Sequence, residues 1–132
     1  MLLVVSTRTA LAVASLTAIL CTATVVSARA AETQAPRISF GSLTPYAVVR
    51  PDAYGRIYIP VRATDDTGLQ SVVLSVPHAT ATLTPSNRPP WALVRAMWDS
   101  GDDAVGVYTI TCTAVDVTGK VTTESLPITL AR

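Results

Sequence analysis

The chain contains few of the residues that enzymes and disulfide-stabilised domains depend on. Its 132 residues include one histidine, two cysteines and one phenylalanine, and only 14% of them are charged. It contains no Gly-x-Ser-x-Gly elbow, His-Glu-x-x-His helix, P-loop or cluster with zinc-ligand spacing. Without a nucleophile, a base and a group that orients the base, the sequence predicts a protein that is not an enzyme and needs no cofactor.

Residues 1–30 are predicted to form a secretory signal peptide. Arg8 is the only charge before an apolar run from residue 10 to 26, and Ala28-Arg29-Ala30 has the small-x-small spacing of a cleavage site before Ala31. A retained membrane anchor is the alternative, because the uncharged run is close to the length that spans a bilayer. Cleavage predicts a protein that is secreted, periplasmic or part of the cell envelope, with no membrane attachment.

Cys21 raises a third possibility, acylation as in a lipoprotein. Leu20 is too large for the position before a lipoprotein cysteine, so this possibility is disfavoured. If Cys21 leaves with the signal peptide, Cys112 is the only cysteine that remains, and no intramolecular disulfide can form. Small exported domains commonly contain disulfides, so this one is predicted to depend on its apolar core.

The charges argue against nucleic acid as a partner. Without Arg8 and Arg29, eight basic residues remain against nine acidic ones, a net charge of −1. The remaining arginines are scattered from Arg37 to Arg132 and form no basic stripe. A phosphate backbone is therefore not an expected ligand.

After a flexible leader over residues 31–37, residues 38–132 are predicted to form one all-β domain. Segments rich in β-branched residues recur between Pro, Gly, Asp and Asn, and none keeps a helical period. Apolar and polar residues alternate over 57–64, 71–76 and 108–114, as they do in half-buried strands. We expect a break near Ser125 and Pro127, and an edge or bulge at Pro60.

Other features of this domain are less decided. Over residues 91–98, either parity buries one tryptophan and exposes the other, so the sequence does not predict the register. The Pro-rich residues 84–90 predict a loop. Cys112 and His78 are the remaining nucleophile and base, but Cys112 is expected inside a strand, as a small apolar residue, and His78 in a loop.

Two stretches share the pattern Ala-x-Asp-x-Thr-Gly at the end of an alternating strand, residues 63–68 and 114–119. With Pro90-Trp91, Trp98-Asp99 and the run from Gly106 to Thr111, they resemble bacterial immunoglobulin-like domains, relatives in shape of cadherin and fibronectin type III modules. The resemblance covers roughly residues 38 to 130 and implies an immunoglobulin-like sandwich of about seven antiparallel strands. It also implies that Tyr108 forms a tyrosine corner.

The implied strand order brings Asp65, Asp66 and Asp116 to one pole of the sandwich. Carboxylates that converge from two loops are ligands that calcium accepts, which makes these residues candidates for a calcium site. The alternative, which we favour, is that aspartate closes a tight turn in which glycine takes a positive φ.

A second acidic loop, with Asp99, Asp102 and Asp103, is expected at the opposite pole. It lacks the residue alternation and terminal glutamate of an EF-hand loop. We expect it to be a solvated turn.

Aromatic side chains provide a further candidate surface. Trp91, Trp98, Tyr46, Tyr54 and Tyr58 could stack on sugar rings, or could simply belong to the core. The predicted function is a non-catalytic exported module for interaction or adhesion, with a protein or polysaccharide of unknown identity as its partner. The alternatives are a calcium-stabilised structural domain, a carbohydrate-binding accessory domain, and an inhibitor of an exported enzyme that would use Arg88 in the loop from Pro85 to Pro90.

Overall fold

Apolar and polar side chains alternate along most of the segments that become strands. A computed structural model describes residues 34–132, so the predicted signal peptide, the first part of the leader and Cys21 lie outside the described residues. Within residues 34–132 there is no helix, and hence none that is long and apolar enough to span a membrane. The strands are β1 (Arg37–Ser39), β2 (Ala47–Val49), β3 (Arg56–Thr64), β4 (Leu69–Val76), β5 (Ala79–Leu83), β6 (Trp91–Asp99), β7 (Gly106–Asp116) and β8 (Val121–Leu130).

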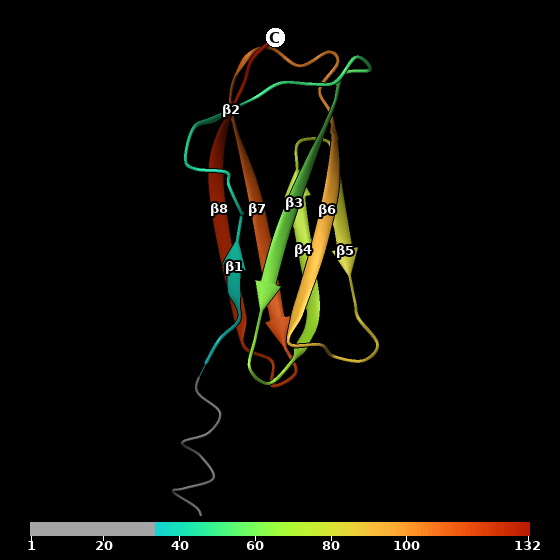
Figure 1. The fold of residues 1–132 in the computed structure, drawn as a ribbon, viewed down its shortest axis with the longest axis vertical. Helices are drawn as coiled ribbons and strands as arrows, with labels where there is room; N and C mark the ends of the chain where they lie inside the picture. The colour runs from blue at the N-terminus through green and yellow to red at the C-terminus, as the bar shows by residue number, and fades with distance from the viewer. Residues whose placement is uncertain (1–33) are drawn as a thin grey trace, which may run out of the picture. The chain divides into compact units, whose positions relative to one another are not determined.

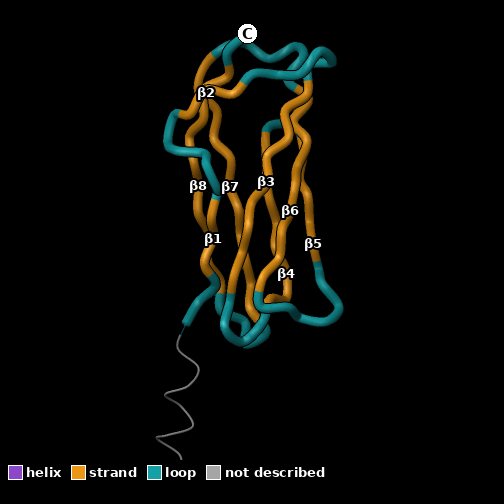
Figure 2. Tube along the Cα trace, in the orientation of Figure 1, coloured by secondary structure: helices purple, strands orange, loops and turns teal. Residues whose placement is uncertain are grey.

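The strands form two sheets packed into a sandwich (Figure 1). One sheet has the order β1-β3-β6 and the other the order β2-β8-β7-β4-β5. The pairs are antiparallel except for β2, which is parallel to β8. β1 lies beside β3, and the chain then crosses through residues 40–46 to place β2 beside β8 (Figure 2). This division of the first strand is why the sandwich has eight strands where the sequence predicted about seven.

The inward sides of the two sheets form one hydrophobic core. Every second side chain is buried in β3, in β4 from Val72 and in β7 from Ile110, with Tyr108 half-buried, which confirms the alternation expected over 57–64, 71–76 and 108–114. Cys112 lies in this core with none of its surface exposed. Burial of a Val, Leu or Ile side chain contributes about 1.5–3 kcal/mol, so these positions hold the two sheets together.

The structure settles the register of β6. Ala92, Val94, Ala96 and Trp98 point into the core, while Trp91 is 54% exposed. The Trp98 ring packs against Tyr108 with 4.8 Å between the ring centroids. The Tyr108 hydroxyl donates to the carbonyl of Ala104 at 2.7 Å, so the expected tyrosine corner is present.

The expected break in the last strand is wrong. β8 pairs with β7 without a register shift from Val121 to Leu130. The carbonyl of Pro127 accepts from the Tyr46 amide, on the side of β8 that faces β2. Because the N–H and C=O of a strand residue point to the same side, the N–H that Pro127 lacks is not needed by the ladder with β7. Val121 lies on the outer face and is 57% exposed.

The ordered sandwich begins slightly before residue 38. Pro36 is buried, its carbonyl accepts from the Thr122 hydroxyl at 2.6 Å, and β1 starts at Arg37. These two residues of the predicted leader therefore pack against the domain.

Candidate functional site

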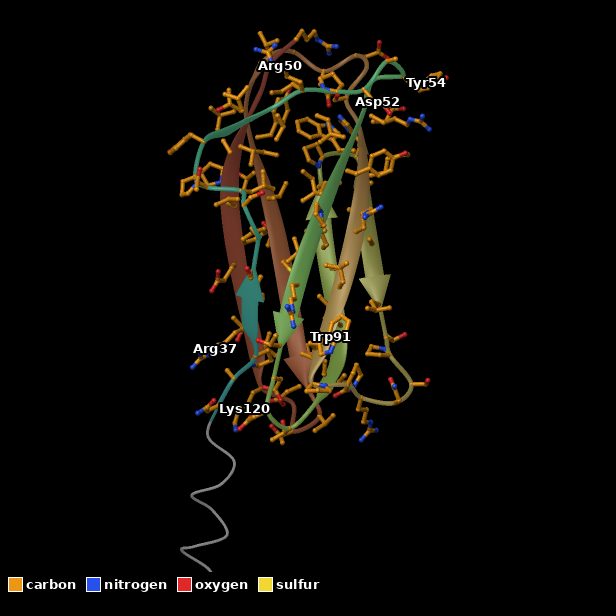
Figure 3. The ribbon with its side chains drawn as sticks, in the orientation of Figure 1. Arg37, Arg50, Asp52, Tyr54, Trp91 and Lys120 are labelled. Carbon is orange, nitrogen blue, oxygen red and sulfur yellow. The ribbon has the colours of Figure 1, made fainter. Side chains whose placement is uncertain are left out.

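The outer surface of the three-stranded sheet carries an unusual set of side chains. In β3 and β6, the residues between the buried positions face outward, and they pair across the strands as Tyr58 with Met97, Pro60 with Arg95, and Arg62 with Leu93. Trp91 follows at the end of the row, opposite Thr64, and lies at the lower end of these strands in Figure 3. We call this set the aromatic–arginine face: Tyr58, Pro60, Arg62, Trp91, Leu93, Arg95 and Met97.

Four large apolar side chains of this face are open to solvent. The exposed fractions are 54% for Trp91, 53% for Leu93, 48% for Tyr58 and 43% for Met97. The Arg62 guanidinium lies over the Trp91 ring, 5.3 Å from its centroid. The indole of Trp91 stays more than half exposed despite this contact.

The outer surface of the five-stranded sheet has a different composition. Where β7 and β8 pair, Thr111 bonds to Ser125 at 2.9 Å and Thr113 bonds to Thr123 at 3.0 Å. The exposed apolar side chains of these two strands are valines near the strand ends, Val107 and Val121. The two outer faces are thus a polar hydroxyl face and an apolar face with arginines.

The five candidate aromatic residues divide between core and surface. Trp98 is fully buried, and its role is structural. Tyr46 is 63% exposed and Tyr54 is 78% exposed, but both precede strands, and Tyr54 stacks under Arg56 at 4.7 Å. Only Trp91 and Tyr58 belong to one continuous surface, the aromatic–arginine face.

The two Ala-x-Asp-x-Thr-Gly stretches form matching turns at one pole of the sandwich. In the first turn, one Asp65 oxygen accepts from the amide and hydroxyl of Thr67 and from the Gly68 amide. In the second, one Asp116 oxygen accepts from the amide and hydroxyl of Thr118 and from the Lys120 amide. Each aspartate therefore closes a turn, as the alternative to a calcium site anticipated.

The second oxygen of each of these aspartates is buried and has no hydrogen-bond partner. Burial raises the pKa of Asp116, but the bonds from Thr118 and Lys120 outweigh this effect, so the pKa lies below its usual value.

Asp66 is exposed and lines a pocket of about 210 Å³ together with Asp65 and Arg37. The charge of Arg37 opposes a cation there. Within residues 34–132, no three acidic, histidine or cysteine side chains are grouped as a metal site would require. Calcium binding by Asp65, Asp66 and Asp116 stays a prediction.

The second acidic loop lies at the other pole, as expected. Asp103 accepts from the Trp98 indole N–H at 2.6 Å and bonds to Nε2 of His78 at 2.8 Å. These bonds, first that of His78 and then that of Trp98, hold the pKa of Asp103 below its usual value. The Arg132 guanidinium donates to the carbonyls of Ser100, Gly101 and Asp103. The loop is a structural cap over Trp98.

Cys112 and His78 do not form a catalytic pair. Burial raises the pKa of the Cys112 thiol to about 11, which keeps it protonated. The imidazole of His78 bonds to Asp103 instead.

The Pro-rich loop is bound to the neighbouring turn. The carbonyls of Pro89 and Pro90 accept from the amides of Leu69 and Asp65, both at 2.9 Å. Arg88 is exposed and has a φ of 47°, in the left-handed region. The proposed inhibitory use of Arg88 stays a prediction.

Comparison with known proteins bears on the fold. No protein-family model matches the chain, and no curated protein matches it. Fibronectin(III)-like modules of Clostridium thermocellum CbhA superpose with a TM-score of 0.48 and 18% identity, over 71% of this chain and 94% of theirs. An engineered protein reaches a TM-score of 0.50 and 21% identity, over 74% of this chain and 20% of that one. CopC from Methylosinus trichosporium OB3b reaches a TM-score of 0.40 and 14% identity, over 72% of this chain and 92% of that one.

Identities this low show the fold alone. The two packed sheets, their strand order and the TM-score of 0.50 with the engineered protein confirm the predicted immunoglobulin-like β-sandwich. A fold of this kind carries many functions, so the function has to be argued from the surface of this chain.

Sequence reasoning identified Trp91 and Tyr58 but not the other members of their face. Leu93, Arg95 and Met97 alternate with Ala92, Val94 and Ala96, and the smaller residues are the buried ones. Because the larger apolar side chains usually go inward, the pattern gave no parity. No local pattern resolves the parity, and the bond between the Trp98 indole and Asp103 is known only once the direction of Trp98 is known.

Proposed function

We propose that this domain is a non-catalytic binding module that works outside the cytoplasm, and that its ligand docks on the aromatic–arginine face. The observation that carries the proposal is the exposure of Trp91, Leu93, Tyr58 and Met97 on one sheet face. Apolar side chains grouped on the surface of a small domain indicate an interaction site, because their exposure to water is unfavourable in free energy and contributes nothing to folding.

The opposite sheet serves as an internal reference. The outer residues of both sheets must favour the strand conformation and tolerate water. Where β7 and β8 pair, threonine and serine side chains satisfy both requirements. The fold therefore does not require tryptophan, leucine and methionine on β6. Aromatic residues, methionine and arginine are the types enriched at binding surfaces, and tryptophan, tyrosine and arginine dominate binding energies.

Two further observations support the remaining parts of the proposal. The thiol of Cys112 is buried and protonated, and His78 bonds to Asp103 in the loop at one pole, so the two do not form a nucleophile and base pair. The predicted signal peptide favours export. These points are consistent with adhesion or ligand capture at the cell envelope or in the medium.

The test is co-sedimentation of the protein, expressed from its full sequence, with cell envelopes of its source organism. Trp91→Ala removes the largest exposed side chain of the face, and Val121→Ala removes apolar surface of similar exposure from the opposite sheet. We expect the native protein and the Val121 variant to sediment equally and the Trp91 variant to remain in solution.

Both variants are expected to fold, since each changed side chain is more than half exposed. Thermal melts check this. Equal sedimentation of the two variants would overturn the proposed site. A native protein that never sediments would overturn envelope binding itself.

A further inference from the structure

The aromatic–arginine face is long and narrow. From Trp91 to Met97 it extends about 20 Å, and two strands about 4.8 Å apart give it a width of roughly 10 Å with side chains included. The face is thus a strip about twice as long as it is wide. The shape suits a linear ligand, either an extended peptide or a chain of sugar rings.

The backbone of β3 offers an extended peptide little. At the two ends of β3, the Gly55 carbonyl accepts from the Ser100 amide and the Asp65 amide donates to the Pro90 carbonyl, so these odd-numbered residues face β6. The Arg56 carbonyl instead accepts from the Asp52 amide, on the opposite side of the strand. The even-numbered residues of β3 therefore point their N–H and C=O groups away from β6.

β1 pairs only with Arg62 to Thr64, so β3 has an open edge at Tyr58 and Pro60. At this edge Tyr58 has the only remaining N–H, because proline has none. A peptide adding a strand there would gain few main-chain bonds, and one lying across the face would gain none. Sugar rings need no such bonds, because their apolar faces stack on exposed aromatic rings.

The charge of the face is positive and uncompensated. Within residues 34–132 the ion pairs are Asp52 with Arg56 and His78 with Asp103, so Arg62 and Arg95 have no carboxylate partner. The acidic side chains of this part of the chain lie at the two poles, apart from Glu124 on β8 in the other sheet, and the one nearest the face is Asp99, at the end of β6 beyond Met97 and opposite Arg56. A ligand with carboxylates would supply the missing partners through charge-assisted hydrogen bonds.

We infer that the ligand is a carboxylated polysaccharide, a chain of sugar rings with uronic acid groups, bound along β6. This inference rests on the proposed function. Trp91 at one end and Tyr58 toward the other stack on sugar rings, and Arg62 and Arg95 between them pair with carboxylates. Two arginines along about 20 Å of strand match a polymer with at most one charge per ring better than a densely sulfated one.

Binding to polygalacturonate, with dextran and dextran sulfate as neutral and sulfated controls, tests the inference. With the protein expressed from its full sequence, we expect binding to polygalacturonate that weakens as NaCl is raised, because salt screens exposed charges. Trp91→Ala should raise Kd roughly tenfold or more, and Arg95→Gln by about threefold to tenfold. Arg50→Gln makes the same charge change at the end of the sandwich away from Trp91, where Figure 3 labels Arg50, and should leave Kd unchanged.

Several results would overturn the inference. One is no binding to polygalacturonate, another is equal or tighter binding to dextran or dextran sulfate, and a third is a Kd that Trp91→Ala and Arg95→Gln leave unchanged. If envelope binding depends on Trp91 but is abolished by protease treatment of the envelopes, the ligand is a protein. In that case the proposed function stands and the ligand class is wrong. If envelope binding does not depend on Trp91, both fail.

Discussion

The repeated turn motif gives a stability prediction with its own control. Gly68 and Gly119 occupy the same position of the two Ala-x-Asp-x-Thr-Gly turns, and both have a positive φ, 114° and 90°. A Cβ at Gly68 would lie 2.6 Å from the carbonyl oxygen of Arg88, whereas a Cβ at Gly119 would meet nothing within 4 Å. The variants Gly68→Ala and Gly119→Ala therefore share backbone strain and differ in a steric clash.

The expected magnitudes follow from these contacts. A positive φ at a non-glycine residue costs about 1–2 kcal/mol, and the smaller entropy of the unfolded chain with alanine affects both variants alike. At Gly68 the clash also pushes away residues 88–90, whose backbone bonds to Leu69 and Asp65 are each 2.9 Å long. Weakening two such bonds costs about another 2 kcal/mol. Gly68→Ala should thus lose about 3–4 kcal/mol and Gly119→Ala about 1–2 kcal/mol.

Urea unfolding of the full-length protein, followed by tryptophan fluorescence, measures both values, because Trp98 leaves the core on unfolding. A difference of about 2 kcal/mol corresponds to a difference in Tm on the order of 10 °C for a domain of this size. The reasoning would be refuted if the two variants lost the same stability within about 0.5 kcal/mol, or if Gly119→Ala lost more.

Three further predictions concern the poles and the core. The His78 and Trp98 bonds lower the pKa of Asp103 in the folded protein. The stability they contribute is therefore complete above the unfolded pKa of about 4 and is lost as the pH falls through the folded pKa. Asp103→Asn should make Tm fall less steeply with acid, and an unchanged dependence of Tm on acid pH would contradict this. In a Cys21→Ser variant, Cys112, buried with a pKa of about 11, should react with a thiol reagent only after denaturant is added, and prompt labelling of the folded variant would be inconsistent with its burial. The calcium hypothesis requires a higher Tm in calcium than in chelator, with the difference lost in Asp66→Asn; an equal Tm in both would exclude it.

Much of the fold could be predicted because strand burial imposes a two-residue period. β3, β4 and β7 each have one apolar and one polar side, and in them the sequence pattern and the burial pattern coincide. The error in β8 had a physical cause that a sequence does not display. Whether a proline interrupts a ladder depends on which neighbour its missing N–H would have faced, and this is known only once the β2–β8 pairing is known.

The two Ala-x-Asp-x-Thr-Gly turns at one pole were predictable for a related reason. Asp65 and Asp116 bond to backbone and hydroxyl groups two to four residues ahead, so their surroundings are set by local sequence. The bond between Trp98 and Asp103 is also local, but it depends on the side chain direction of β6. The candidate ligand-binding surface depends on that direction too, and the periodicity of apolar residues could not supply it.

The direction of β6 connects stability and proposed function in one strand. Trp98 fits the core because its indole N–H, which would be costly to bury unpaired, finds Asp103 at 2.6 Å. Once Trp98 is inward, the two-residue period forces Trp91, which is an odd number of residues away, outward. The alanines at 92 and 96 complete the inward side with small side chains, which lets Trp98 and its neighbours from the other sheet fill the space. The folding requirements of β6 are thus met by its even-numbered residues, and the proposed function gives a role to the exposed side chains at its odd-numbered positions from Trp91 to Met97.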